Sequence, residues 1–298
     1  MPVSIPLESF GFLQLEGARA TEFLQGQLTC DLRQASATHF ISGAWCTPKG
    51  RVICSMALWQ QAADRVILRM SADLLQATAA QLSKYAALSR VRIVPGELRC
   101  VGVLGLVDAG TRSRLALPWP DQAGEVRVFG DGAVLRLDAA GERHELWVTE
   151  DASAKVLQRL REVLPEGSGN DWRLALVRAG IAEIRSATCE LFLPQMLGYD
   201  SDGRVSFRKG CYTGQEIVAR THYKGGVKRH LHRLEGCGEP PAPGTALEFR
   251  GQSAGTVVES AVSGEGTCDV LAVLADDLAA DAAGTPFVAA GTEFHLPA

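Results

Sequence analysis

Hydrophobic residues recur along this chain with two different periods, one typical of helices and one typical of strands. Apolar residues at helical spacing predict helices over residues 17–28, 74–86, 151–164 and 172–180. Short apolar runs between turn residues predict strands within 43–59, 66–70, 98–107 and 124–148. The first of these runs contains Pro48-Lys49-Gly50, so we expect it to form a hairpin. Because helices and strands do not alternate regularly, the pattern predicts an α+β fold.

The pattern changes after Cys237. Residues 238–244 read GEPPAPG and predict a turn-rich link. Beyond this link, short apolar runs separated by glycine predict strands at 246–250, 255–260, 270–275 and 286–289. Four or five short strands in about 60 residues predict a small β-barrel or sandwich at the carboxyl end.

Composition and charge limit the class of protein. The chain has 298 residues, of which 46% are hydrophobic and 21% charged, which suits a globular protein of two or three domains and excludes a disordered or coiled-coil one. The formal charge of −4 argues against attraction of the whole protein to nucleic acid or an anionic membrane. Residues 204–233, however, hold eight Lys or Arg and one acid, whereas residues 236–298 hold nine acids and one Arg. The sequence therefore leaves open whether the protein has a local basic patch.

Targeting signals and familiar metal or nucleotide motifs are missing from the sequence. The amino-terminal stretch has no basic region followed by an apolar one, and no apolar run reaches roughly 18 residues, so we expect a cytoplasmic protein. The eight cysteines contain no ligand-spaced pair, so we expect free thiols and no metal site. His230 and His232 are expected as surface histidines. The P-loop, GxGxxG, GxSxG and HExxH motifs are absent.

The segment 207–229 is the richest in candidate chemistry. Thr213 and Glu216 have the T-x-x-E spacing of a capping box ahead of an apolar-periodic run, so a helix is predicted to begin at Thr213. Cys211 then lies two residues before the cap, close to Lys209. A helix dipole and neighbouring cations favour a thiolate and lower a cysteine pKa from about 8.5 toward neutrality. Cys211 is therefore the best candidate for a reactive thiol, and the alternative is a small buried residue in a tight turn.

Three stretches resemble one known family. KGCYTGQE at 209–216, followed by VAR at 218–220 and KR at 228–229, resembles the signature of the YgfZ family of folate-binding proteins, relatives of the glycine-cleavage T protein. FLQGQLTCDL at 23–32 resembles the family's amino-terminal helix motif, and FLPQMLGYDSDGRVSF at 192–207 resembles the segment before the cysteine motif. The match spans most of the chain, and the cysteine motif is specific. The chain is thus identified as a member of this family.

The resemblance implies a three-domain, ring-like fold of the aminomethyltransferase type around a channel that holds tetrahydrofolate, with a carboxy-terminal β-barrel. It implies a discontinuous first domain of residues 1–50 with 165–234, a second domain of residues 51–164 and a barrel domain of residues 235–298. The implied role is assistance in assembling or repairing iron–sulfur clusters in enzymes, including some that modify tRNA. Expected partners are folate and iron–sulfur client or assembly proteins, with no membrane and no direct nucleic acid.

The resemblance also implies which residues form the site. Cys211 and Lys209 would be the reactive pair. The aromatic positions that contact folate in the family fall on Trp172 and Phe10, whose alternative role is core packing. The cations of the basic segment would meet the anionic tail of folate or remain solvated surface. The residues implied for the cofactor are Trp172, Phe10, Arg178, Glu183, Tyr212, Gln215, Glu216, Arg220 and Lys228.

Two departures from the glycine-cleavage relatives bear on activity. Where those relatives have an E-A-G motif whose glutamate anchors the pterin, this chain has Arg178-Ala179-Gly180, so the anchor is lost or is replaced by Glu183. Where they have an Asp-Asp pair on the hairpin, this chain has Cys54-Ser55. A neutral pair cannot stabilise a developing cation as a carboxylate does. Aminomethyl transfer is therefore disfavoured, and it is open whether the protein is an enzyme.

Three functions are consistent with the sequence. The first is a folate-dependent accessory protein in which Cys211 acts on a cluster or a target protein. The second is a transferase of one-carbon units, which Cys54-Ser55 disfavours. The third is an RNA-interaction module that uses the basic segment. It ranks last because base stacking needs interleaved aromatic residues, and this segment offers Phe207, Tyr212 and Tyr223.

Overall fold

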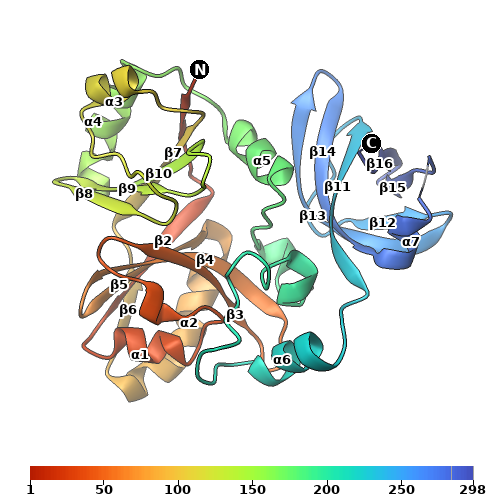
Figure 1. Ribbon diagram of the computed structural model, residues 1–298, viewed down its shortest axis with the longest axis horizontal. Coiled ribbons are helices and arrows are strands. Elements are labelled where there is room, and N and C mark those ends of the chain that lie inside the picture. The colour runs from red at the N-terminus through yellow and green to blue at the C-terminus, as the bar shows by residue number, and fades with distance from the viewer. Residues whose placement is uncertain (283, 298) are drawn as a thin grey trace. The chain divides into compact units, whose positions relative to one another are not determined.

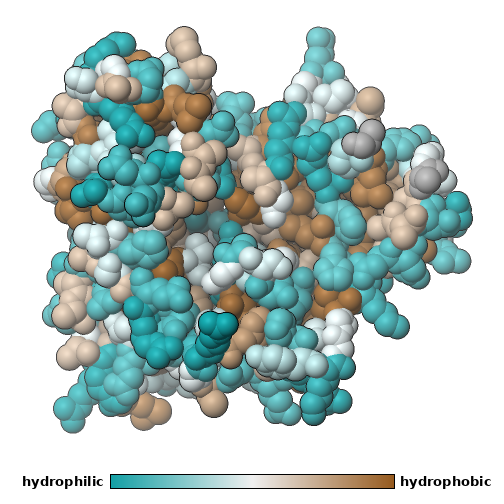
Figure 2. Space-filling view, in the orientation of Figure 1, coloured by the Kyte–Doolittle hydropathy of each residue, from teal (hydrophilic) through white to brown (hydrophobic). Residues whose placement is uncertain are grey.

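The computed structural model describes residues 1–282 and 284–297. None of the helices in these residues is long and apolar enough to cross a membrane. The chain forms two compact units, and each unit combines two stretches of sequence: Met1–Gly43 with Met56–Gly169, and Ala44–Ser55 with Asn170–Ala298. Figure 1 labels the elements of both units. On the face seen in Figure 2, hydrophilic side chains make up most of the surface, and hydrophobic side chains show in smaller groups between them.

One antiparallel sheet of the first unit has the strand order β1-β7-β10-β9-β8. Its strands are β1 (Val3–Pro6), β7 (Leu98–Leu104), β10 (Arg143–Thr149), β9 (Gly132–Arg136) and β8 (Val126–Phe129). Two helices, α3 (Ala109–Leu115) and α4 (Glu150–Arg161), supply apolar residues to the core of this sheet. Leu115 and Leu160 are fully buried there against Val101 and Val103. The predicted strands and the predicted helix near 151–164 are thus confirmed.

The other sheet has the order β3-β4-β5-β2-β6, and its strand β4 runs from the second unit into the first. Its strands are β3 (Phe40–Cys46), β4 (Val52–Ala62), β5 (Arg65–Ser71), β2 (Phe10–Glu16) and β6 (Arg92–Pro95). The helices of this region are α1 (Ala20–Gln25) and α2 (Leu75–Ala86), with the 3-10 turns η1 (Leu32–Gln34), η2 (Ala72–Leu74) and η3 (Ala87–Ser89). The predicted hairpin is confirmed. The helix predicted at 17–28 is shorter, because glycines flank it at both ends: Gly17 has a φ of +139°, and Gly26 is the C-cap.

A buried ion pair joins the two sheets within the first unit. Arg69 on β5 and Glu145 on β10 are both buried, and Arg69 Nη2 lies 3.2 Å from Glu145 Oε1. Trp147 Nε1 donates a hydrogen bond to the other carboxylate oxygen at 2.7 Å. The Trp147 ring also makes edge contacts with Phe12 and Trp59. Removing the Arg69 guanidinium would leave the Glu145 carboxylate without this cation in the core, and breaking a buried pair usually costs about 3–5 kcal/mol.

The second unit carries the tip of the β3–β4 hairpin, two helices and a barrel. The helices are α5 (Gly169–Arg178) and α6 (Gln215–Lys224), and the segment between them includes the 3-10 turns η4 (Ser186–Thr188) and η5 (Pro194–Leu197). The helix predicted at 172–180 is confirmed as α5. The second unit also contains most of the residues that the sequence singled out for chemistry.

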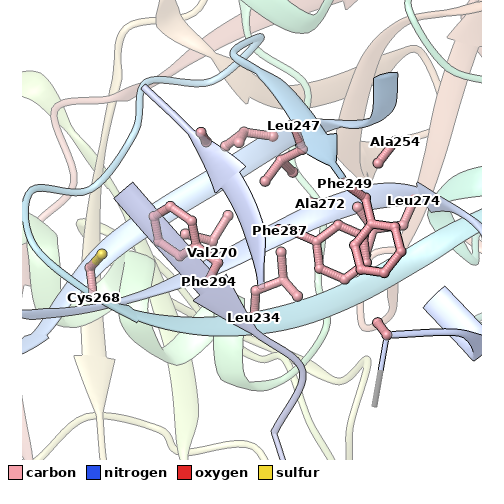
Figure 3. Close-up of a cluster of buried hydrophobic side chains, with 13 residues drawn as sticks. Leu234, Leu247, Phe249, Ala254, Cys268, Val270, Ala272, Leu274, Phe287 and Phe294 are labelled. Carbon is pink, nitrogen blue, oxygen red and sulfur yellow. The ribbon is translucent and has the colours of Figure 1, made fainter. Parts of the chain in front are cut away.

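The carboxyl end of the second unit is a closed barrel with the order β11-β14-β13-β12-β15-β16. Its strands are β11 (Arg229–Cys237), β14 (Thr267–Ala275), β13 (Gln252–Gly264), β12 (Ala246–Phe249), β15 (Phe287–Ala289) and β16 (Thr292–His295), and α7 (Asp276–Ala280) follows β14. Figure 3 shows the interior, where the rings of Phe249 and Phe287 lie 5.0 Å apart and Phe294 is fully buried. The predicted barrel is confirmed, and the sandwich alternative is excluded. The division into three domains stays a prediction.

His144 on β10 gives the first unit a pH-dependent stability. The side chain is fully buried with its ring 5.1 Å from Trp119, and neither ring nitrogen has a hydrogen-bond partner within the described residues. Burial, and then the charges of Arg112 and Arg136, lowers the pKa of His144 from 6.5 to about 4. Between these two values the unfolded chain binds a proton that the folded chain excludes. The free energy of unfolding therefore falls by about 3 kcal/mol as the pH falls through this window.

We predict that His144→Phe removes most of this pH dependence, because the buried titrating group is gone. Denaturant unfolding at about pH 7 and about pH 5 measures the difference in free energy. His295→Phe, at an exposed position in the barrel, is the matched control and should keep the wild-type slope. If His144→Phe keeps the wild-type dependence of unfolding free energy on pH, His144 is not the group that causes it.

Candidate functional site

The cysteine segment packs against the tip of the β3–β4 hairpin. The tip is closed by two backbone hydrogen bonds of 2.8 Å, from Thr47 N to Arg51 O and from Gly50 N to Thr47 O. Gly50 has a φ of +72° and lies against the side chain of Ile217 on α6. Gly214 has a φ of +86°, and a Cβ there would lie 2.4 Å from the Thr47 carbonyl oxygen. Only glycine allows this close approach.

Helix α6 starts later than the sequence predicted. Its N-cap is Gly214 and its first residue is Gln215. The predicted helix start at Thr213 is therefore one residue too early, because the contact with the hairpin places a left-handed glycine at the N-cap. Cys211 lies three residues before the N-cap rather than two.

Cys211 is exposed on the loop that precedes α6. Cys237 is exposed as well and Cys189 is half-buried, whereas every other cysteine is buried. Lys209 is only 7% exposed, and its Nζ lies 5.2 Å from the centroid of the Tyr212 ring. The alternative of a buried Cys211 therefore does not hold. The thiol is accessible, and a buried ammonium group lies two residues before it.

The groups next to the cysteine loop in the interior are inert. Tyr212 is buried, and its hydroxyl has no hydrogen-bond partner in the part of the chain that the structure describes. Burial, with a contribution from Cys46, raises the pKa of Tyr212. Burial, with a contribution from Cys54, raises the pKa of Cys46. Both groups stay protonated near neutral pH, so sulfur chemistry in this region falls to Cys211.

The hairpin also places Ser55 against a buried carboxylate. Ser55 Oγ donates a hydrogen bond of 2.8 Å to Glu183 Oε2 and accepts one of 2.9 Å from Ile184 N. Ser55 and Glu183 are 2% and 8% exposed, respectively. The position where the glycine-cleavage pattern has an acid therefore holds a hydroxyl that donates to an acid from another segment.

Tyr199 and Arg204 complete a polar cluster beside Glu183. The Tyr199 hydroxyl and Arg204 Nη1 both donate to the carbonyl oxygen of Ala182 at 2.9 Å. The Arg204 guanidinium lies 4.6 Å from the centroid of the Tyr199 ring. Burial raises the pKa of Tyr199, so its hydroxyl stays a donor.

Arg178 is held by the barrel. Its Nε donates to Asp269 Oδ2 at 2.9 Å, and the Asp269 side chain is 5% exposed. Arg185 makes a similar contact with the barrel, because its Nε donates to Glu259 Oε2 at 2.7 Å. Both acids are buried on barrel strands and need cationic partners. The Arg178 guanidinium thus has a structural partner at the position that the sequence considered for the pterin.

Several curated proteins similar to this chain carry one name. The proteins called "tRNA-modifying protein YgfZ" from Yersinia pseudotuberculosis serotype O:1b (strain IP 31758) and Yersinia pestis (strain Pestoides F) are 31% identical over 283 residues, 93% of this chain and 86% of theirs. The protein of that name from Sodalis glossinidius (strain morsitans) matches at the same identity and coverage. This chain belongs to the YgfZ family. A comparison with models of protein families finds no match.

The fold expected for the YgfZ family is confirmed by a solved structure. Glycine cleavage system aminomethyltransferase T from Bartonella henselae superposes with a TM-score of 0.77 and covers 100% of this chain and 85% of its own. The two sequences are 16% identical, so this likeness shows the fold alone.

The two aromatic residues implied for folate in this YgfZ-family chain are both buried. Trp172 on α5 is 2% exposed, and its Nε1 is buried without a hydrogen-bond partner among the residues described. Phe10 belongs to the first unit, where the Arg69 guanidinium lies 4.0 Å from its ring centroid. Phe10 also lines a cavity of about 400 Å³ together with Cys100 and Leu157. Contact of either ring with a ligand stays a prediction.

The remaining candidates lie along α6 and beyond it. Glu216, Arg220 and Lys228 are exposed, and Gln215 is half-buried. Within residues 1–282 and 284–297, no hydrogen bond or ion pair joins any of these four to Glu183. The structure therefore brings together Lys209 with Tyr212, and Ser55 with Glu183, but it does not gather the α6 residues around the buried acid.

Sequence reasoning missed several residues that hold this site. Asp269 and Glu259 are acids within the apolar strands β14 and β13, and an acid in a buried strand is a signal that a cationic partner exists. The role of Ser55 had no such signal, because its partner lies 128 residues away. His222 stacks on Phe207 at 3.8 Å and was not counted among the aromatic residues.

We predict that Gly214→Ala destabilises the second unit by about 1–3 kcal/mol, because a Cβ would clash with Thr47 and φ is positive. Thermal unfolding measures this loss, and faster proteolysis of the cysteine loop should accompany it. Gly226→Ala is the matched control, since a Cβ there meets nothing within 4 Å. Equal stability of the two variants would show that the close approach does not hold α6.

Proposed function

We propose that this protein binds tetrahydrofolate and supports tRNA modification, with Cys211 as the reactive group that serves iron–sulfur clusters of client enzymes. Relatives in the YgfZ family are named tRNA-modifying proteins, and the fold is that of an aminomethyltransferase T. The observation that carries the proposal is the exposed Cys211 thiol on a loop whose position is set by Gly214.

The chemistry of a thiol suits this role. Iron–sulfur clusters are held by cysteine thiolates, and the thiolate is also the nucleophile in thiol–disulfide exchange. Cys211 is exposed, so a client protein can reach it, and the adjacent Lys209 and Arg208 place positive charge near the sulfur. The buried Cys46 and Cys54 lack this access.

The residues around Glu183 fit a pterin. The pterin ring presents N–H donors and acceptors on its edge, and Glu183 is a buried carboxylate, the type of group that accepts hydrogen bonds from such N–H donors. Trp172 Nε1 is a buried donor without a hydrogen-bond partner in the described chain. We assign pterin binding to the Glu183 carboxylate. We do not assign it to the Arg178 guanidinium, since Arg178 is paired with Asp269. Tetrahydrofolate would supply one-carbon or redox chemistry when bound.

Aminomethyl transfer is the second candidate, favoured by the likeness to aminomethyltransferase T. That reaction develops positive charge on an amine, which a carboxylate at the hairpin would stabilise. Here the hairpin position is Ser55, a neutral hydroxyl whose proton is directed to Glu183. This arrangement favours binding over transfer.

We predict that Cys211→Ser abolishes complementation in cells that lack the protein, because serine cannot replace a thiolate. The readout is the level of tRNA modifications that iron–sulfur enzymes make. Cys237→Ser, at the other exposed cysteine, should complement normally. Alkylation of the purified protein followed by mass spectrometry tests access directly, and it should label Cys211 in the wild type. Full complementation by Cys211→Ser would refute the thiol role.

We predict that Glu183→Gln weakens tetrahydrofolate binding about 10- to 100-fold, as expected for losing a buried charged hydrogen bond. Arg178→Lys keeps the ion pair with Asp269 and should bind as the wild type does. Isothermal titration calorimetry measures both affinities, and circular dichroism checks that both variants fold. The opposite ranking, with binding lost in Arg178→Lys alone, would place the pterin at Arg178 instead.

A further inference from the structure

Three aromatic rings form an exposed group near the end of α6, which we call the ring cluster. The rings of Phe207 and His222 are stacked, with centroids 3.8 Å apart and planes 15° apart. Tyr223 meets these two rings edge-on, at 6.0 and 4.8 Å. Tyr223 is 69% exposed, His222 is exposed and Phe207 is half-buried. The ring cluster therefore presents aromatic surface to solvent.

The cations near the ring cluster are not neutralised by acids of this protein. Residues 204–233 hold eight Lys or Arg, and Glu216 is the one acid. Arg204 and Arg233 make ion pairs. In the described part of the chain, the members of this segment that have no ion pair are Arg208, Arg220, Lys224, Lys228 and Arg229. The basic segment that carries the exposed rings thus also carries unpaired positive charge.

Helical spacing places one ring of the cluster, Tyr223, beside two of the cations, whereas His222 lies four residues after Val218 and so on the other side of the helix. Arg220, Tyr223 and Lys224 are related by three and four residues along α6 and so share a side of the helix. Arg208 directly follows Phe207 on the neighbouring loop. The opposite side of α6 is occupied, since Val218 is fully buried and its carbonyl oxygen accepts a hydrogen bond from Gln195 Nε2.

We propose that the ring cluster and these cations form a docking surface for a single-stranded segment of RNA. Unpaired bases stack on aromatic faces, and backbone phosphates pair with unneutralised cations. The proposal deepens the proposed function in tRNA modification, on which it rests, by naming the partner of α6. The sequence ranked RNA last, but it counted the buried Tyr212 and left out His222, whose ring completes the stack.

Other polyanions fit this surface less well. A membrane surface requires hydrophobic side chains that insert between lipids. Among the described residues, Tyr223 is the one large and exposed hydrophobic side chain in the basic segment. An acidic peptide would pair with the cations but would leave the stacked rings without a partner. A single-stranded nucleic acid uses the rings and the charges together.

The experiment measures binding of the full-length protein to a fluorescein-labelled oligouridine of about twelve nucleotides, by fluorescence anisotropy over a range of salt concentrations. Tyr223→Ala should weaken binding about tenfold, the loss expected for one stacked base. Lys224→Gln should reduce the slope of log affinity against log salt by roughly 0.7. Tyr85→Ala and Lys84→Gln are matched controls, because the same pair of residue types is exposed on α2, and they should bind as the wild type does.

Several results would overturn the proposal. The first is failure of the wild type to bind the oligouridine at low salt, and the second is equal affinity of Tyr223→Ala and the wild type. A third is binding to phosphatidylserine vesicles that Tyr223→Ala abolishes while RNA binding is unaffected, which would identify the surface as a membrane contact.

The outcome is separable from that of the proposed function. Tyr223→Ala, which removes no cation, should keep wild-type alkylation of Cys211 and wild-type heat of tetrahydrofolate binding. If RNA does not bind and Cys211→Ser still loses tRNA modification, the docking surface fails while the proposed function stands. If RNA binds but Cys211→Ser complements fully, the docking surface stands while the proposed function fails.

Discussion

The close approach of Gly214 to the Thr47 carbonyl oxygen is the constraint on which the chemistry of the second unit depends. Because the residue at this point must be a left-handed glycine, α6 can begin there and lie directly on the hairpin tip. The contact sets the position of Cys211 on the loop before the helix and of Tyr223 near its end. The hydrogen bond from Gln195 to the Val218 carbonyl oxygen holds the middle of the helix. One backbone contact therefore positions both the thiol and the aromatic surface.

The ion pairs of the second unit explain how the acidic and basic segments of the chain are used. Buried carboxylates are costly unless a cation pairs with them. The acidic barrel buries Asp269 and Glu259, and their partners are Arg178 and Arg185, which precede the basic segment in sequence. These two buried acids thus pair with arginines that lie outside residues 204–233. Among the described residues of that segment, Arg208, Arg220, Lys224, Lys228 and Arg229 have no ion pair, which leaves them available to an external anion.

Local features of this fold were predictable and contacts between distant segments were not. The hairpin, helix α5 and the barrel follow from periodicity and turn residues, because these depend on neighbours in sequence. The predicted start of α6 at Thr213 differs from the observed N-cap at Gly214 because the T-x-x-E rule considers only the chain around Thr213, whereas Gly214 is placed by its contact with the hairpin. The alternation of His230 and His232 indicated a strand at β11, but its bounds were not predicted because its polar and apolar residues do not form an apolar run. For Cys211 the sequence left an accessible thiol and a buried residue as alternatives, and the exposure of Cys211, like the pairing of Ser55 with Glu183, required the fold.

The pairing of Ser55 with Glu183 also constrains what chemistry this unit supports. Two carboxylates in contact cannot both stay ionised without another compensating charge, since each raises the pKa of the other. With Glu183 buried at 2.8 Å from the Ser55 hydroxyl, an acid at position 55 would be forced toward protonation. The hydroxyl avoids that conflict and keeps Glu183 an acceptor. A charged acid at the hairpin and a charged acid at Glu183 are therefore alternatives. Because this chain has the acid at Glu183, no carboxylate stands at the hairpin position of Ser55, and the exposed thiols of this unit are those of Cys211 and Cys237.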